Sequence, residues 1–274
     1  MSGFIEMMAA PVATALILVG MHGYLGTHVV RRGVIFVDIA LAQMAAFGVA
    51  LAMLFGAEIG TLTAYLVGIA STIFGAVLLS FTRTSDDKVP QEAYIGIVYV
   101  VFSAAMILVL SHVAHGGEEI QNLLVGAILW VSWAEMLKTT VLYALLGLVL
   151  WRSHGALMRI STDPDGARAD GLNLRLWDFI FYAVLGTVVT ASVQIVGVLM
   201  VFTMLVVPTV MSLKLFSTTR AQFTFIVLIG TLAVISGVAL SYVLDLPTGA
   251  AIVCTFGVFL GAQVAVTGLR GARS

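Results

Sequence analysis

Charged residues are scarce in this chain. Asp, Glu, Lys and Arg make up 10% of its 274 residues, whereas soluble domains carry about 25% charged residues. Hydrophobic residues account for 61% of the chain, and its mean hydropathy is +1.10. So few charges cannot cover so much apolar surface in water, so the composition excludes a soluble protein and predicts an integral membrane protein surrounded by lipid.

Cysteine and excess positive charge are also missing. Cys254 is the single cysteine, which excludes an intrachain disulfide and a cysteine-cluster metal site. A formal net charge of −1 gives no support to nucleic-acid binding. The sequence contains neither a Gly-rich phosphate-binding loop ending in Lys-Ser/Thr nor a His-Glu-x-x-His segment. We therefore expect a non-catalytic protein that is neither an ATPase nor an intramembrane metalloenzyme.

Long apolar runs fill most of the chain. A membrane-spanning helix needs about 20 apolar residues. The runs that approach this length are 4–25, 33–55, 59–81, 93–111, 134–151, 175–192, 196–215, 222–243 and 248–267. They predict an all-α fold: a polytopic transmembrane helical bundle of about eight or nine spans, in one domain covering residues 1–274. A shorter apolar run at about 120–130 is predicted to be interfacial or re-entrant.

Lysine and arginine occur in alternate connections between these runs. The connections around 56–58, 112–120, 193–195 and 244–247 contain neither residue. The other connections and the carboxyl tail hold Arg31, Arg32, Arg83, Lys88, Arg152, Arg159, Arg168, Arg175, Lys214, Arg220, Arg270 and Arg273. Because positive residues are retained on the cytoplasmic side, the pattern predicts an amino terminus outside and a carboxyl terminus in the cytoplasm.

One acidic residue lies inside a predicted span. Asp38 follows Arg32 by six residues, which on a helix places it roughly 9 Å into the apolar layer. A carboxylate at the bilayer centre costs about 2.5–3.5 kcal/mol on insertion scales, so such residues mark ion paths or buried partners. Asp38 is therefore a candidate metal ligand in a translocation pathway. The alternative is an Asp paired with Arg31, Arg32 or a backbone donor, which would only hold two helices together. Gln43 lies about 140° further around the helix and is a weaker pathway candidate.

A second polar cluster occupies one of the outward connections. Imidazole nitrogens and carboxylate oxygens suit zinc, manganese and iron, so these side chains are a candidate capture site. A solvated polar loop is an equally good interpretation, and both stay open. The residues concerned are His112, His115, Glu118 and Glu119.

The longest cytoplasmic connection contains signals for a short helix at about 163–171. Asp163 is a helix-capping residue, Pro164 fits the first helical position, and Gly171 can end the helix in the left-handed conformation. The helix is interpreted either as a connector or as a docking site for a soluble motor subunit. The candidate docking residues are Asp163, Pro164, Asp165, Ala167, Arg168 and Gly171.

Five segments together resemble one known family. They are Arg31-Arg32 with Asp38, and the segments 92–97, 124–132, 163–172 and 196–208. In this order they resemble the membrane permeases of the zinc, manganese and iron importers (ABC-3 type) among the ATP-binding-cassette transporters. The resemblance extends over most of the chain.

The resemblance implies a membrane-spanning permease subunit of an importer for divalent transition metal ions. It implies a homodimer around a central pathway, two cytoplasmic ATP-binding subunits that hydrolyse ATP, and an extracytoplasmic metal-binding protein. It places the chain in the lipid of a bacterial-type plasma (inner) membrane. The metal ion would be the transported substrate, with no permanently bound cofactor. The helix at 163–171 resembles the coupling helix that docks the ATP-binding subunit.

The chain departs from the family pattern at one position. Many members have His four residues after the pathway Asp, and this chain has Ala42 there. Loss of the imidazole favours harder ions such as manganese, although zinc and iron stay candidates. The alternative function is an ion-gradient-driven secondary transporter that uses the same buried Asp. Such transporters commonly show inverted repeats, and the sequence contains none that we can find.

Overall fold

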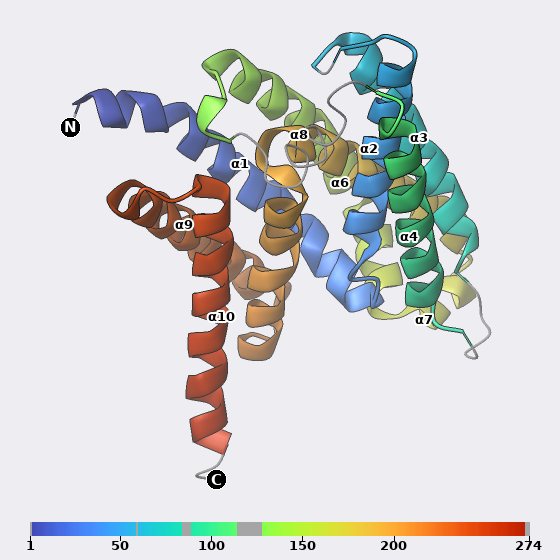
Figure 1. Cartoon of the computed structure of the whole chain (residues 1–274). Helices are drawn as coiled ribbons and strands as arrows, with labels where there is room; N and C mark the ends of the chain where they lie inside the picture. Colours follow the sequence, from blue (N-terminus) through green and yellow to red (C-terminus); the bar gives the residue numbers. More distant parts are fainter. Residues whose placement is uncertain (1, 59, 84–88, 114–127, 272–274) are drawn as a thin grey trace. The chain divides into compact units, whose positions relative to one another are not determined.

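The structure is a computed structural model that describes residues 2–58, 60–83, 89–113 and 128–271 (Figure 1). These residues are overwhelmingly helical and contain no strand. The helices are α1 (Ser2–Arg32), α2 (Val37–Leu54), α3 (Leu62–Phe81), α4 (Gln91–Leu110), α6 (Trp133–Thr162), α7 (Pro164–Ala169), α8 (Leu174–Leu215), α9 (Thr219–Leu244) and α10 (Thr248–Gly271), with a 3-10 turn, η1 (Ile128–Trp130).

Eight of the described helices are long and apolar enough to cross a membrane. The predicted all-α, polytopic bundle is therefore confirmed. Most of the predicted short run at 120–130 lies outside the described residues, and its last residues form η1.

The longest helix, α8, joins two predicted spans. A continuous helix of 42 residues would measure roughly 63 Å, about twice the hydrocarbon thickness of a bilayer. The backbone leaves the helical conformation at Gly197, with φ 76° and ψ 161°. Gly tolerates this positive φ because it has no Cβ. The break falls next to the predicted boundary between 192 and 196, so α8 consists of two helical segments, each of span length.

The described chain divides into two compact units. One consists of Met1–Val30, Val125–Leu142 and Ile195–Ser274, and the other of Arg31–Leu124 and Tyr143–Gln194. We call them the first and the second unit. The prediction of one domain over residues 1–274 stays a prediction.

The second unit has α2 at its centre. Most of α2 is buried, and it packs against α3 and α4, whereas α4 and the part of α6 in this unit expose apolar side chains. Small residues permit the close packing: a Cβ on Gly48 would lie 2.7 Å from the carbonyl oxygen of Val67 in α3. Such contacts are typical of membrane helices, which associate through backbone approach and not through exclusion from water.

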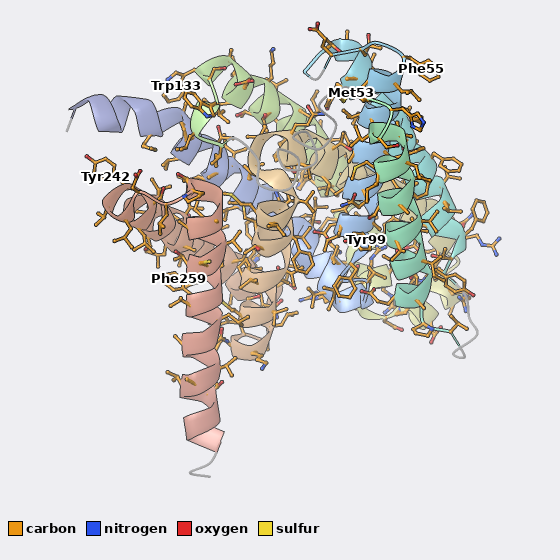
Figure 2. The ribbon with its side chains drawn as sticks, in the orientation of Figure 1. Met53, Phe55, Tyr99, Trp133, Tyr242 and Phe259 are labelled. Atoms are coloured by element: carbon orange, nitrogen blue, oxygen red, sulfur yellow. The ribbon has the colours of Figure 1, made fainter. Side chains whose placement is uncertain are left out.

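The first unit is packed in the same way. A Cβ on Gly26 of α1 would lie 2.1 Å from the carbonyl oxygen of Leu205 in α8, and one on Gly237 of α9 would lie 2.6 Å from Cα of Ile252 in α10. Aromatic side chains occur at helix ends, where Figure 2 shows Trp133 of α6 and Tyr242 of α9. Both are more than half exposed, as expected for side chains at a membrane–water boundary.

Candidate functional site

The candidate pathway residue Asp38 lies in the first turn of α2. Gly33, with a left-handed φ of 67°, reverses the chain after α1, and α2 begins at Val37. The side chain of Asp38 is 1% exposed, and its Oδ1 atom has no hydrogen-bond partner among the described residues. The carboxyl group lies against the backbone N–H groups of Asp38 and Ile39. Oδ1 of Asp38 is therefore a buried acceptor that could receive a hydrogen bond or a cation.

The arginines next to Asp38 in sequence bind elsewhere. Nη1 of Arg32 lies 2.6 Å from Oδ1 of Asp178, and Nη1 of Arg31 lies 2.9 Å from Sδ of Met158. The alternative in which Asp38 forms an ion pair with one of these arginines is thus not the arrangement found.

Glu92 lies near Asp38 and caps the amino terminus of α2. Its Oε1 atom accepts a hydrogen bond of 2.9 Å from the backbone N–H of Phe36, the residue before the helix. Its Oε2 atom is buried without a hydrogen-bond partner in the described structure, and the carboxylate is close enough to act electrostatically on Asp38. From the sequence we would interpret Glu92 only as an acid at the start of α4. Its second role, at α2, depends on a contact across 56 residues.

Gln43, further along α2, has another buried acceptor. Its side chain is 6% exposed, and its Oε1 atom likewise lacks a hydrogen-bond partner in the described part of the chain. Ala42, one helical turn beyond Asp38, is 1% exposed. The unsatisfied buried acceptors on α2 and at the start of α4 are thus all oxygens. Carboxylate and carbonyl oxygens suit harder cations, manganese among them.

The described residues contain no group of three or more His, Cys, Asp and Glu side chains that could hold a metal ion.

The outer cluster is described only in part. His112 is exposed, and its Nδ1 atom lies 3.1 Å from both the hydroxyl of Ser111 and the carbonyl of Leu108. The other candidates, His115, Glu118 and Glu119, lie outside the described residues. The capture site stays a prediction.

The short helix predicted at 163–171 is α7. Oδ1 of Asp163 accepts a hydrogen bond of 2.9 Å from the backbone N–H of Gly166, Pro164 is the first helical residue, and Gly171 has a φ of 80°. The helix boundaries predicted from the sequence are confirmed. The exposed face of α7 carries Pro164, Asp165 and Arg168.

Ala167 lies on the opposite face of α7. It is fully buried, and it packs with Ile160 of α6 and Leu174 of α8. Its side chain therefore holds α7 in place and leaves the exposed face to the other predicted docking residues.

The two ends of α7 are tied to α6 by one arginine. Arg159 binds Asp163 at 2.7 Å and Asp170 at 2.9 Å. A Cβ on Gly166 would lie 2.1 Å from Oδ2 of Asp163 and 2.5 Å from a guanidinium nitrogen of Arg159. Only Gly therefore fits there without displacing the Arg159–Asp163 ion pair.

A second buried carboxylate, Asp178, was not singled out from the sequence. It is fully buried in α8 and binds Arg32 at 2.6 Å and Arg83 at 2.8 Å. Asp178 lies inside the predicted span 175–192, and an acidic residue inside a span is costly unless it is paired or functional. The reasoning that identified Asp38 could therefore have identified Asp178 as well. Its partners lie 146 and 95 residues away in the sequence, so only the fold reveals them.

Comparison with known proteins agrees with this arrangement of helices. A model of the ABC 3 transport family matches residues 4–266. The chain belongs to the ABC 3 transport family. Among relatives of this ABC 3 permease, the manganese transport system membrane protein MntC of Halalkalibacterium halodurans is 24% identical over 241 residues, which cover 88% of this chain and 80% of the relative.

Two further relatives have comparable similarity. The manganese import system permease protein ScaB of Streptococcus parasanguinis is 24% identical over 246 residues, covering 90% of this ABC 3 permease and 85% of the relative. A Haemophilus influenzae protein named "Probable iron transport system membrane protein" is 24% identical over 265 residues, covering 97% and 95%.

Solved structures share the fold. PsaBC from Streptococcus pneumoniae, in complex with an Fab, has a chain that matches with a TM-score of 0.78 and 21% identity, over 94% of this chain and 91% of that one. A transporter described as of the metal-chelate ABC type, in an inward-facing conformation, matches with a TM-score of 0.70 and 20% identity, over 93% and 85%. The ABC 3 permease thus has the fold of these chains along nearly its whole length.

Proposed function

We propose that this ABC 3 permease forms the membrane part of an ATP-driven importer of divalent metal ions, and that the ion passes beside Asp38. The observation that carries the proposal is the buried Oδ1 atom of Asp38, which has no hydrogen-bond donor among the described residues. An unpaired carboxylate in an apolar layer is unfavourable unless a cation or a water-filled path comes to it. The names of the relatives, which are manganese and iron transport proteins, support the same assignment.

The proposed substrate is manganese or iron in preference to zinc. The buried acceptors are the oxygens of Asp38, Gln43 and Glu92, with Ala42 in place of the imidazole that zinc binds well. The metal ion is cargo, so we propose no permanently bound cofactor.

The proposed assembly contains two copies of this chain, two cytoplasmic ATP-binding subunits and an extracytoplasmic metal-binding protein. The exposed residues of α7 dock the ATP-binding subunit, which performs the ATP hydrolysis. The amino terminus is outside and the carboxyl terminus is cytoplasmic. The alternation of Lys and Arg supports this orientation, and so does the break in α8, because the eight span-length helices of the described residues, one of them divided, give an odd number of crossings.

The test is metal uptake by the permease reconstituted into lipid vesicles with its ATP-binding subunit. Labelled manganese, iron and zinc are supplied singly, with ATP, without ATP, and with an ATP-binding subunit that cannot hydrolyse ATP. We expect uptake only where ATP is hydrolysed, with manganese or iron faster than zinc. Uptake that ignores ATP and follows an imposed proton or sodium gradient would establish the secondary transporter instead.

A further inference from the structure

We propose that Asp178 transmits movement of the coupling helix α7 to α2, the helix that carries Asp38. Arg32 and Arg83, which both bind Asp178, are its two attachments. The inference rests on the proposed function, because it assigns a task to the proposed ATPase-docking helix. It makes Asp178 a positioning residue that does not touch the metal ion.

The first link connects α7 to Asp178. Buried Ile160, Ala167 and Leu174 hold the end of α6, α7 and the start of α8 together, with Leu172 and Trp177 packed against them. Arg159 braces both ends of α7. We call the residues 158–178 the elbow. Asp178 lies four residues beyond Leu174, one helical turn along the same face of α8, so a displacement of α7 carries Asp178 with it.

The second link connects the elbow to the end of α1. Arg32 donates from Nη1 to Asp178 at 2.6 Å and from Nε to the hydroxyl of Ser161 in α6 at 2.9 Å. Its guanidinium carbon lies 4.3 Å from the ring centroid of Phe181, and its side chain is only 2% exposed. Arg32 is therefore held by both helices of the elbow, away from competing water.

The third link connects Arg32 to the pathway. Six residues separate Arg32 from Asp38, and the intervening chain is a tight turn. It contains left-handed Gly33, and the backbone N–H of Val37 donates to the carbonyl of Val34 at 3.1 Å. A turn this short leaves little slack, so a movement of Arg32 displaces the start of α2 and the carboxylate of Asp38.

Arg83 provides the releasable attachment. It follows the end of α3, its Nη1 atom lies 2.8 Å from both oxygens of Asp178, and its side chain is 18% exposed. The cluster thus contains two guanidinium groups and one carboxylate. Arg32 Nη2 is buried without a hydrogen-bond partner among the described residues. With one positive charge in excess, the cluster can lose the more exposed arginine to water and still keep a neutral Arg32–Asp178 pair.

The experiment uses the complex of the permease with its ATP-binding subunit. The variants are Asp178→Asn, which removes the charge and keeps the shape, and Arg83→Gln, which removes only the partly exposed attachment. Arg175→Gln is the matched control, because Arg175 lies in the same elbow and its guanidinium carbon lies over a ring, 5.9 Å from the centroid of Phe81. Assembly, ATP hydrolysis and metal uptake are measured on each complex.

We expect Asp178→Asn to assemble and hydrolyse ATP like the control while metal taken up per ATP falls about tenfold, and Arg83→Gln to lower the same ratio about threefold. Uptake and hydrolysis that fall in the same proportion in Arg83→Gln would show a merely structural cluster and overturn the proposal. An unchanged ratio in both variants would overturn it too.

A readout without cargo separates this inference from the proposed function. Cys254 is the only cysteine, so a Cys254→Ser chain can be labelled at Phe55→Cys with an environment-sensitive fluorophore. Phe55 is 85% exposed at the end of α2, where Figure 2 labels it beside Met53. We expect ATP to change the signal in the parent chain and in Arg175→Gln, and to leave it unchanged with Asp178→Asn or Arg83→Gln. If ATP still changes the fluorescence in both Asp178→Asn and Arg83→Gln, Asp178 does not transmit movement to α2, and this result holds whichever metal the complex transports.

Discussion

Asp38 and Asp178 are the same residue type in the same unit, and they meet opposite surroundings. Both are almost completely buried. Asp178 accepts hydrogen bonds from two arginines, whereas Oδ1 of Asp38 has no partner in the described structure, although Arg31 and Arg32 stand seven and six residues before it. The fold directs the nearest positive charges away from Asp38 and toward Asp178.

The difference separates two uses of a buried carboxylate. A paired one joins helices, since its removal leaves guanidinium groups uncompensated in an apolar layer. A buried carboxylate without an ion-pair partner costs free energy because it has lost its contact with water. A residue kept in spite of this cost is typical of a site that receives a cation. Burial and residue type alone do not distinguish the two, and the position of the arginines does.

The largest difference is expected in stability. Asp178→Asn leaves the buried guanidinium of Arg32 and the partly exposed one of Arg83 without a counter-charge, and it should lower the free energy of unfolding by about 3–5 kcal/mol. Asp38→Asn removes a buried charge that has no ion-pair partner and should change it by less than about 1 kcal/mol, or stabilise. Thermal and denaturant unfolding of the purified permease in detergent measures both. Equal losses would mean that the two carboxylates are equivalent.

The two arginines of the cluster should also differ. Arg32→Gln should destabilise by about 2–3 kcal/mol, because it breaks a buried charged hydrogen bond and a contact with Ser161. Arg83→Gln should destabilise by about 1 kcal/mol, because water reaches its side chain. The same unfolding experiment compares them, with Arg175→Gln as control. A larger loss for Arg83→Gln would reverse the roles assigned to the two attachments.

Within the elbow, Asp163→Ala should remove the cap of α7 and destabilise the protein by about 1 kcal/mol. The affinity for the ATP-binding subunit should fall with it, as measured by titration of the labelled subunit onto the reconstituted permease. Asp165→Ala is the control for charge, because its ion pair to Arg168 is long and exposed, at 3.9 Å. If Asp163→Ala and Asp165→Ala lose the same affinity for the ATP-binding subunit, docking depends on the acidic charge of α7 and not on its shape.

The smallest effect concerns the choice of metal. Ala42→His places an imidazole one helical turn beyond Asp38, and it should raise zinc uptake relative to manganese a few fold. Ala42→Leu controls for added volume at this buried position. Competition between labelled zinc and manganese gives the ratio. A ratio that moves equally in both variants would show that packing, and not ligation, sets it.

Local chemistry accounts for what the sequence predicted well. Asp163, Pro164 and Gly171 are capping residues, and their preferences depend on the nearest few residues, so both boundaries of α7 are predictable. The spans follow from long apolar runs in the same way. The burial of Asp38 could also be predicted from its distance to Arg32.

Contacts between distant segments account for the rest. The partners of Asp178 come from the ends of α1 and α3, and Glu92 caps α2 across 56 residues. Which arginine pairs with which acid depends on how these helix ends meet in the fold. The sequence contains no motif that indicates these pairs. The extension of α6 to Thr162, beyond the apolar run 134–151, has a related cause: its last turns pack in the elbow through Ile160.

The proposed passage of metal beside Asp38 is tested most directly by ATP-driven uptake of manganese and iron by Asp38→Asn. The control is Glu58→Gln, which changes an exposed acid in the connection between α2 and α3, at the end of α2 opposite Asp38. We expect Asp38→Asn to assemble with the ATP-binding subunit and to hydrolyse ATP, yet to take up metal only at the background of vesicles without ATP, while Glu58→Gln transports normally. Uptake at the parental rate by Asp38→Asn would contradict the proposed passage.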